Sequence, residues 1–240
     1  MSNVIETTYC DKCGDELESS QIGMCEACRP RAFSELSEKA KQKAREEYTS
    51  GDYPGYDWWD NVYEDAIRMA KIIGVTFDNK TVNLVSGKTR YDPMIYFFGF
   101  GSQSDGACFA GGYCFNPSCV KEMNAETDDV ELIRIATELY TMQLARRLLG
   151  LEHFTATIAT HGRYSHSGTI EVNVNSEDEN DEHSQIGNDL EDAVTQLMRD
   201  FADWIYKQLE AENDYLYSDE YVDEELSQDD KEFDEDGALI

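Results

Sequence analysis

Four cysteines near the N-terminus have the spacing of a metal-binding site. Cys10, Cys13, Cys25 and Cys28 form the pattern C-x2-C-x11-C-x2-C. Each C-x-x-C pair can turn two thiolates toward one ion, and four thiolates without a histidine or carboxylate favour closed tetrahedral coordination of Zn2+. A closed site leaves no position for a substrate, so we expect structural zinc in a small ribbon or knuckle pair. The metal would supply the folding free energy of this short segment. A redox pair or free thiols are the alternatives.

Two polar loops bracketed by glycine, residues 99–106 and 161–168, hold the other residues that could do chemistry. The candidates for ligand binding are Ser102, Gln103, Ser104, Arg163 and Tyr164, and those for acid–base catalysis are Asp105, His161 and His166. If both loops lie at one edge of a sheet, these groups could bind an anion or transfer protons. The alternative, which we favour, is that they only form turns and satisfy neighbouring groups. We therefore assign no catalytic residue.

Other motifs for catalysis or metal binding are weak or absent. The sequence has no phosphate-binding P-loop, no nucleophile elbow and no H-E-x-x-H. Cys108, Cys114 and Cys119 do not form paired knuckles. A second metal site that combines one of them with His161 or His166 is a minor alternative.

The elements that must position these residues are amphipathic helices and short strands. Helical periodicity covers residues 32–48, 57–73, 128–149 and 188–211, with Asp57, Asp128 and Asn188 as expected N-caps. Strands are expected at residues 94–98, 107–115, 154–158 and 170–174. Each polar loop then connects two strands of a hairpin. The predicted class is α+β, with an antiparallel four-stranded sheet packed by helices.

The same pattern divides the chain into four parts. They are a zinc-binding module at residues 1–31, a helical linker at 32–55, an α+β core domain at 56–211 and an acidic tail at 212–240.

The chain is strongly acidic, with a formal net charge of −30 over 240 residues. Residues 176–240 contain 24 acidic and three basic side chains, so most of this charge lies in the C-terminal quarter. Such a surface opposes binding to duplex DNA or to anionic membranes and favours a basic protein partner. Because neither a transmembrane segment nor a signal peptide is evident, we expect a cytoplasmic protein.

The strings GFGSQSDGACFAGG at residues 99–112 and HGRYSHSG at residues 161–168 carry a resemblance. The chain resembles a poorly characterised group of phage, prophage and plasmid proteins, some of them labelled antitoxin-like, over roughly residues 56–175. The four-cysteine module and the acidic tail look like additions to that core. The resemblance implies a mobile-element context, with the cytoplasm of the host cell as the location, where acidic proteins often block nucleic-acid enzymes.

Three functional hypotheses follow. The first is a non-enzymatic acidic binding or inhibitor protein that docks a basic partner, such as a nucleic-acid-binding enzyme or complex, by imitating nucleic acid. The second is a nucleotide-binding protein or hydrolase that uses residues 102–108 and 161–166. The third is a structural or assembly protein with a solubilising tail. A homo-oligomer is compatible with each of them.

Overall fold

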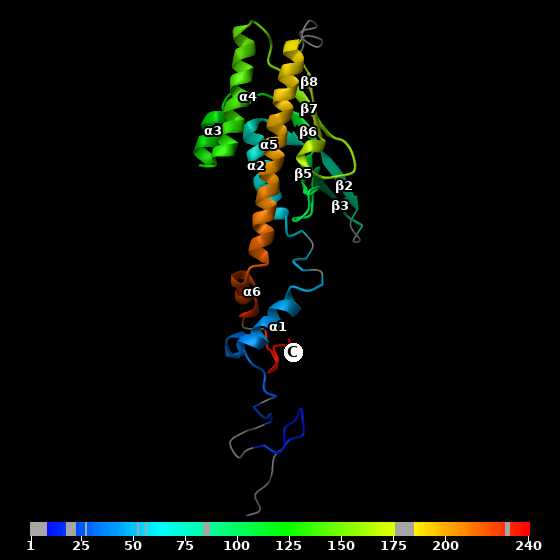
Figure 1. The fold of residues 1–240 in the computed structure, drawn as a ribbon, viewed down its shortest axis with the longest axis vertical. Coiled ribbons are helices and arrows are strands. Elements are labelled where there is room, and N and C mark those ends of the chain that lie inside the picture. The colour runs from blue at the N-terminus through cyan, green and yellow to red at the C-terminus, as the bar shows by residue number, and fades with distance from the viewer. Residues whose placement is uncertain are drawn as a thin grey trace, which may run out of the picture. The chain divides into compact units, whose positions relative to one another are not determined.

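The computed structural model describes residues 9–17, 23–26, 28–51, 53–55, 57–83, 87–175, 185–228 and 231–240, without the side chains of 185–188. The chain divides into two compact units (Figure 1). We call residues 59–212 the α+β unit, and residues 1–58 together with 213–240 the terminal unit. Each unit is described by itself.

The α+β unit contains a four-stranded antiparallel sheet, which confirms the predicted fold class. Its strands are β1 (Val75–Phe77), β6 (Gly111–Tyr113), β7 (Thr155–Thr160) and β8 (Ile170–Asn175), in the spatial order β1-β6-β7-β8. The β7–β8 hairpin is the predicted pair around the second polar loop. Along both strands buried and exposed residues alternate, so one face of the sheet packs on the core and the other faces solvent.

The first predicted hairpin is also present, but it lies outside this sheet. β4 (Ile95–Phe98) and β5 (Gly106–Phe109) form a separate two-stranded sheet. The single strand predicted at residues 107–115 is wrong, because Ala110 interrupts it. The amide of Ala110 donates to the Met94 carbonyl at 3.0 Å, while its own carbonyl accepts from the amide of Asp78 at 2.9 Å. Beyond this residue, β6 joins the larger sheet instead.

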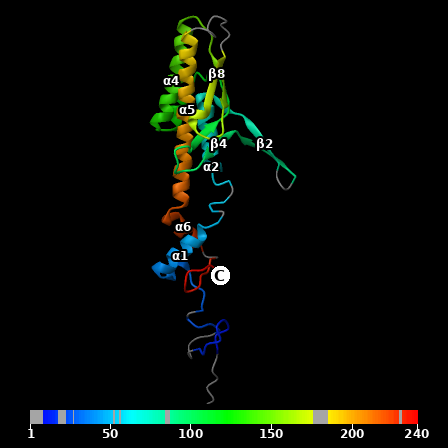
Figure 2. The ribbon, with the colours of Figure 1, turned by 45° about the vertical axis from the view of Figure 1, so that its right-hand side comes forward.

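A third pair of strands was not predicted at all. β2 (Asn79–Asn83) and β3 (Thr89–Pro93) form a two-stranded ribbon that extends away from the four-stranded sheet (Figure 2). Most of its side chains are polar and exposed. Its strands therefore lack the alternation of apolar residues from which strands are recognised in a sequence.

Four helices complete the α+β unit: α2 (Asp60–Ile73), α3 (Cys119–Glu126), α4 (Val130–Leu148) and α5 (Gln185–Leu216), the last of which continues beyond residue 212. Three expected N-caps are wrong. α2 starts after Trp59, and Asp57 lies outside it with a φ of 69°. α4 is capped by Asp129, whose carboxylate accepts the amides of Glu131 and Leu132. α5 begins three residues before Asn188.

The helices cover one face of the sheet, with α2, α4 and α5 on the same side of it (Figure 1). A cluster of aromatic rings joins the layers: Phe201 of α5 lies 6.4 Å from Phe77, 5.7 Å from Phe109 and 5.8 Å from Trp204, measured between ring centroids. The predicted apolar stripe of α5 is buried at Val194, Leu197, Met198, Phe201, Ile205 and Leu209.

One fully buried polar side chain, Gln143 of α4, connects this helix to the start of β7. Its amide nitrogen donates to the Phe154 carbonyl at 2.9 Å, and its Oε1 accepts from the Phe154 amide at 3.2 Å. The same oxygen lies 3.1 Å from Nδ1 of His153. Gln143 thus satisfies backbone groups that would otherwise be buried without partners.

The terminal unit combines segments from both ends of the chain. It contains η1 (Phe33–Glu35), α1 (Glu38–Tyr48) and α6 (Asp219–Leu226). Its buried cluster consists of Phe33, Leu36, Ala40, Ala44, Val222, Leu226 and Phe233. The region expected to be a linker and the region expected to be an acidic tail therefore share one small core.

Specific contacts connect the two ends of the chain within the terminal unit. Arg45 of α1 makes a bidentate ion pair with Asp223 of α6, at 2.6 and 2.8 Å. The backbone of Arg31 forms an antiparallel bridge with that of Phe233. Gly237 approaches α1 so closely that a Cβ atom would lie 2.1 Å from the Ala40 carbonyl oxygen, so only glycine fits there.

Candidate metal centre and the polar loops

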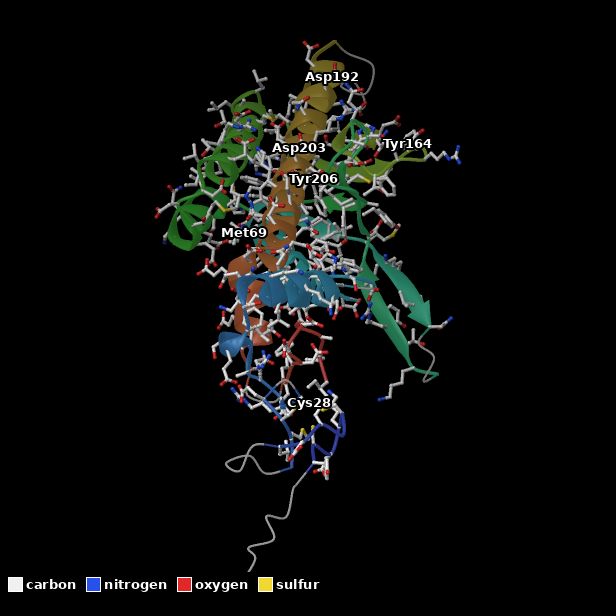
Figure 3. All side chains as sticks on the ribbon, turned by 60° about the horizontal axis from the view of Figure 1, so that its bottom comes forward. Cys28, Met69, Tyr164, Asp192, Asp203 and Tyr206 are labelled. Atoms are coloured by element: carbon white, nitrogen blue, oxygen red, sulfur yellow. The ribbon has the colours of Figure 1, made fainter. Side chains whose placement is uncertain are left out.

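The four N-terminal cysteines converge on one point. Their sulfur atoms all lie within 4.8 Å of one another, and Sγ of Cys13 is 3.6 Å from Sγ of Cys25. Tetrahedral coordination with Zn–S bonds of about 2.3 Å requires sulfurs roughly 3.8 Å apart. The donor set and its spacing therefore fit one metal ion held by four thiolates, and Figure 3 shows Cys28 beside the other sulfur atoms.

Local hydrogen bonds form the two turns that carry these cysteines. In the first turn, the amide of Gly14 donates to the Cys10 carbonyl at 2.9 Å, and the amide of Cys10 donates to the Asp15 carbonyl at 2.8 Å. In the second, the amides of Cys28 and Arg29 both donate to the Cys25 carbonyl. Each C-x-x-C pair is thereby held by its own turn.

The backbone around the cluster favours the thiolate form of Cys10. Amide groups of Cys13 and then of Cys25 hydrogen-bond to its sulfur and lower its pKa to about 6, against the opposing effect of burial. Thiolates are the form that binds metal, so the environment of Cys10 suits a metal ligand. The hydrogen bond between the side chains of Cys28 and Cys25 raises the pKa of Cys28, so a metal ion would have to displace the proton from that thiol. Within the described residues, no other cluster of three or more His, Cys, Asp or Glu side chains has the geometry for a metal ion.

The two polar loops meet at one place in the α+β unit. A Cβ atom added to Gly106, next to Asp105, would lie 2.7 Å from Cβ of His166. The absence of a side chain at residue 106 therefore permits the contact between the loops. The first loop is also held by α5, because the Tyr206 hydroxyl donates to the Gly99 carbonyl at 3.0 Å.

The candidate acid–base residues have local partners at this meeting point. The Asp105 carboxylate accepts hydrogen bonds from the Ser102 hydroxyl at 2.6 Å and from the amides of Gly101 and Ser102 at 2.7 and 2.6 Å. These bonds lower the pKa of Asp105, the Ser102 hydroxyl contributing most. Nδ1 of His166 accepts from the amide of Gly168 at 3.1 Å. Both residues therefore form turns, which favours the structural interpretation.

The remaining candidates are spread over the surface near these turns. His161 lies 3.2 Å from the Glu171 carboxylate, and both side chains are mostly exposed. Tyr164 is exposed (Figure 3). Arg163, Ser102 and Gln103 are also exposed, while Ser104 is half-buried. Cys108 is buried beside the loops, and burial raises the pKa of its thiol. The loops thus come together with most of the candidate side chains exposed to solvent.

Two hollows in the α+β unit contain residues that the sequence did not indicate. One, of about 450 Å³, lies between β7, β8 and α5 and includes His161, Glu171, Glu191, Asp192 and Arg199. The other, of about 360 Å³, lies between α2, β4 and the β2–β3 ribbon. Sequence reasoning placed the aromatic residues of α2 in the core and did not predict the ribbon, so it offered no signal for the second hollow.

The fold and the cysteine cluster together define an α+β protein with an N-terminal candidate metal centre. Residues 58–219 match the model of the family described as "Domain of unknown function (DUF8835)". The chain therefore belongs to this family, which agrees with the expected likeness to a poorly characterised group. No curated protein and no solved structure matches the chain. Within the described parts of the chain, no helix combines the length and apolar character needed to span a bilayer.

Proposed function

We propose that this protein is a non-enzymatic binding protein that docks a basic partner on an ordered acidic surface. The observation that carries the proposal is the order of its acidic C-terminal segment. Within residues 213–228, α5 continues to Leu216 and α6 covers Asp219–Leu226, and Phe233 near the chain end is only 1% exposed. Its carboxylates therefore occupy defined positions, as recognition of a particular partner requires, whereas a solubilising tail needs no such order.

Helix α6 presents part of this surface. Asp219, Glu220 and Glu224 are exposed, while Asp223 on the same helix is held by Arg45. Carboxylates fixed on a folded scaffold can occupy a site that evolved for phosphates. The more specific form of the proposal is therefore that this acidic surface imitates nucleic acid. The protein would then inhibit an enzyme that binds nucleic acid.

The larger hollow of the α+β unit offers a second place for basic side chains. Glu171, Glu191 and Asp192 line it with Arg199 and His161, in a volume of about 450 Å³. Arg199 is engaged by the Ile170 carbonyl at 2.9 Å, so it is fixed to the sheet. The three carboxylates then leave the hollow net acidic, which suits an arginine or lysine of a partner.

For the cysteine cluster, we propose that the metal is Zn2+ and that its role is structural. Four thiolates complete the tetrahedral coordination of zinc, so the site leaves no position for a reacting group. The metal would stabilise the two turns that carry the four cysteines and would help to form a docking surface there.

Affinity capture from host cells tests the docking proposal, using two charge variants with the same net charge. The first carries Asp219→Asn, Glu220→Gln and Glu224→Gln on α6. The second carries Asp78→Asn, Asp128→Asn and Glu152→Gln in the α+β unit. We expect a captured protein to be lost with the first variant or at high salt, and to remain with the second.

Other outcomes of this capture contradict the proposal. Equal loss with both variants would mean that only net charge matters, as for a solubilising surface, and would favour a structural or assembly protein. If the captured protein remains bound at high salt, electrostatic attraction does not explain the binding. Three further expectations stay predictions: an origin in phages or mobile elements, a cytoplasmic location and a homo-oligomeric state.

A further inference from the structure

The smaller hollow of the α+β unit has three walls of different character. Its volume of about 360 Å³ lies within the usual range of small-molecule sites. The helical wall consists of Trp59, Asp60, Tyr63, Glu64 and Ile67. These residues recur at intervals of three and four, so they share one face at the start of α2. The helix thus lines the hollow with aromatic and apolar groups flanked by two carboxylates.

The second wall is one face of the β2–β3 ribbon. Lys80 pairs with Asp92 and Val82 pairs with Arg90 across the two strands, so these four side chains lie on the same face. Three of them, Lys80, Arg90 and Asp92, line the hollow. Nε of Arg90 lies 2.6 Å from the Asp92 carboxylate, which neutralises its charge.

The third wall is aromatic and rigidly held. Ile95, Tyr96 and Phe97 of β4 line the hollow, and Phe97 meets Trp59 edge-on with ring centroids 5.6 Å apart. The hydroxyl of Tyr63 donates to the Ile95 carbonyl at 3.2 Å, which joins the helix to this strand. The lining rings are therefore positioned before any ligand arrives, which lowers the entropic cost of binding.

The charges around the hollow disfavour an anionic ligand. Its lining contains three acids, Asp60, Glu64 and Asp92, and two bases, Lys80 and Arg90. Arg90 is paired with Asp92, and Lys80 already lies over the Tyr96 ring, 5.3 Å from its centroid. The formal charge of −30 on the whole chain adds to the repulsion of anions.

We propose that this hollow binds a planar aromatic small molecule, of nucleobase or indole size, that carries no net negative charge. Flat rings can stack on Trp59, Tyr96 or Phe97, while amino groups of the ligand can approach the carboxylates of α2. The site shares no residue with the acidic surface of α6, so it does not depend on the docking proposal.

Nuclear magnetic resonance of the full-length, zinc-loaded protein tests this site through its tryptophan indole N–H signals. Three probes of similar ring size differ in charge: tryptamine is cationic, adenosine is neutral and adenosine monophosphate is anionic. We expect tryptamine and adenosine at millimolar concentration to shift the Trp59 signal, and the monophosphate to do so at least about tenfold more weakly. The Trp204 signal is the internal control, because its indole N–H donates to Asp129 at 2.9 Å.

A matched pair of substitutions locates the binding. Tyr96→Ala removes a lining ring and should weaken binding about tenfold, the usual effect of one lost stacking contact. Tyr91→Ala removes a ring that is 70% exposed on the opposite face of the ribbon and should leave binding unchanged. If Tyr96→Ala lowers the melting temperature, Ile67→Trp at the 43% exposed rim position serves instead, because the larger ring would block the hollow.

The results that overturn the proposal are equally specific. A Trp59 signal that none of the three probes shifts excludes the site. Equal affinity of the Tyr96→Ala and Tyr91→Ala proteins places binding elsewhere, and so does unchanged binding by Ile67→Trp. If adenosine monophosphate binds as tightly as adenosine, the charge of the lining does not select the ligand.

Discussion

The two units of this protein are stabilised in different ways. The α+β unit buries large aromatic and aliphatic side chains between a sheet and several helices, including Phe109, Phe154 and Phe201. Among its described residues, the terminal unit has a cluster of seven buried residues, two of which are alanines. Burial of apolar surface therefore stabilises the first unit by itself. We expect the second to depend in addition on closure by the C-terminal segment and on a metal ion held by the four cysteines.

The distribution of charge follows the same division. The α+β unit contains 12 basic and 26 acidic residues among 154, and the terminal unit contains eight and 24 among 86. The unit with the smaller core thus carries about twice the net negative charge per residue, and self-repulsion opposes its compact state. Specific ion pairs such as Arg45–Asp223 offset part of this repulsion. The comparison predicts that the terminal unit is the one more sensitive to metal and to truncation.

The largest expected effect comes from removing one cysteine ligand. Cys25→Ser should abolish stoichiometric zinc binding and the amide protection of the turns that carry the four cysteines, because a structural zinc site contributes on the order of 10 kcal/mol to folding. The melting of the α+β unit should not change. Zinc content by atomic emission and hydrogen exchange measure these effects. Cys114→Ser, at an exposed cysteine outside the cluster, is the control and should retain zinc. Full zinc content in Cys25→Ser would contradict the metal site.

A smaller effect is expected from Phe233→Ala in the terminal unit. Phe233 is 1% exposed and its ring lies 5.9 Å from that of Phe33, so its loss should cost about 3–5 kcal/mol. Hydrogen exchange in α1 under increasing denaturant measures it. Leu239→Ala, at a 60% exposed position, should change stability by less than about 0.5 kcal/mol. An equal loss of protection in α4 would show that the two units do not unfold separately.

The corresponding test of the α+β unit is Gln143→Leu. This change leaves the amide and carbonyl of Phe154 buried without their side-chain partner, at a cost of about 1–3 kcal/mol. Chemical denaturation followed by tryptophan fluorescence measures the free energy of unfolding. Gln196→Leu, on the exposed side of α5, is the control. A neutral effect of Gln143→Leu would mean that the buried amide is not needed for the junction of α4 and β7.

The smallest expected effect concerns one turn in each unit. The Ser102 hydroxyl and nearby amides lower the pKa of Asp105, and the Ala238 amide lowers that of Asp234. Because both values are lower in the folded state, each carboxylate stabilises its turn above the unfolded pKa of about 4. That stability is lost as the pH falls through the folded pKa.

Amide chemical shifts of Ser102 and Ala238 during an acid titration measure the two transitions. Asp105→Asn should remove the transition at Ser102 alone, and Asp234→Asn that at Ala238 alone. A Ser102 transition that persists in Asp105→Asn would assign the effect to another group.

Much of the fold could be predicted because it depends on local patterns. The helical stripe from Val194 to Leu209 and the alternation of β7 and β8 reflect which side chains face the core, and this can be read from periodicity. The residues at which helices begin were predicted less accurately. Asp129 rather than Asp128 caps α4, and its carboxylate also accepts the indole N–H of Trp204, a contact between residues far apart in sequence. β1 is three residues long and owes its pairing to the neighbouring Gly111.

The sequence by itself determined the cysteine site and the fold class. The spacing of Cys10, Cys13, Cys25 and Cys28 limits which ligand sets can form, and strand and helix periods are local properties. The tertiary structure alone decided that α6 and Phe233 pack on α1, that Asp105 and His166 form turns, and that Trp59 and Tyr96 line one hollow. These outcomes depend on contacts between distant segments. Composition and periodicity do not specify such contacts, because many pairings bury similar apolar area.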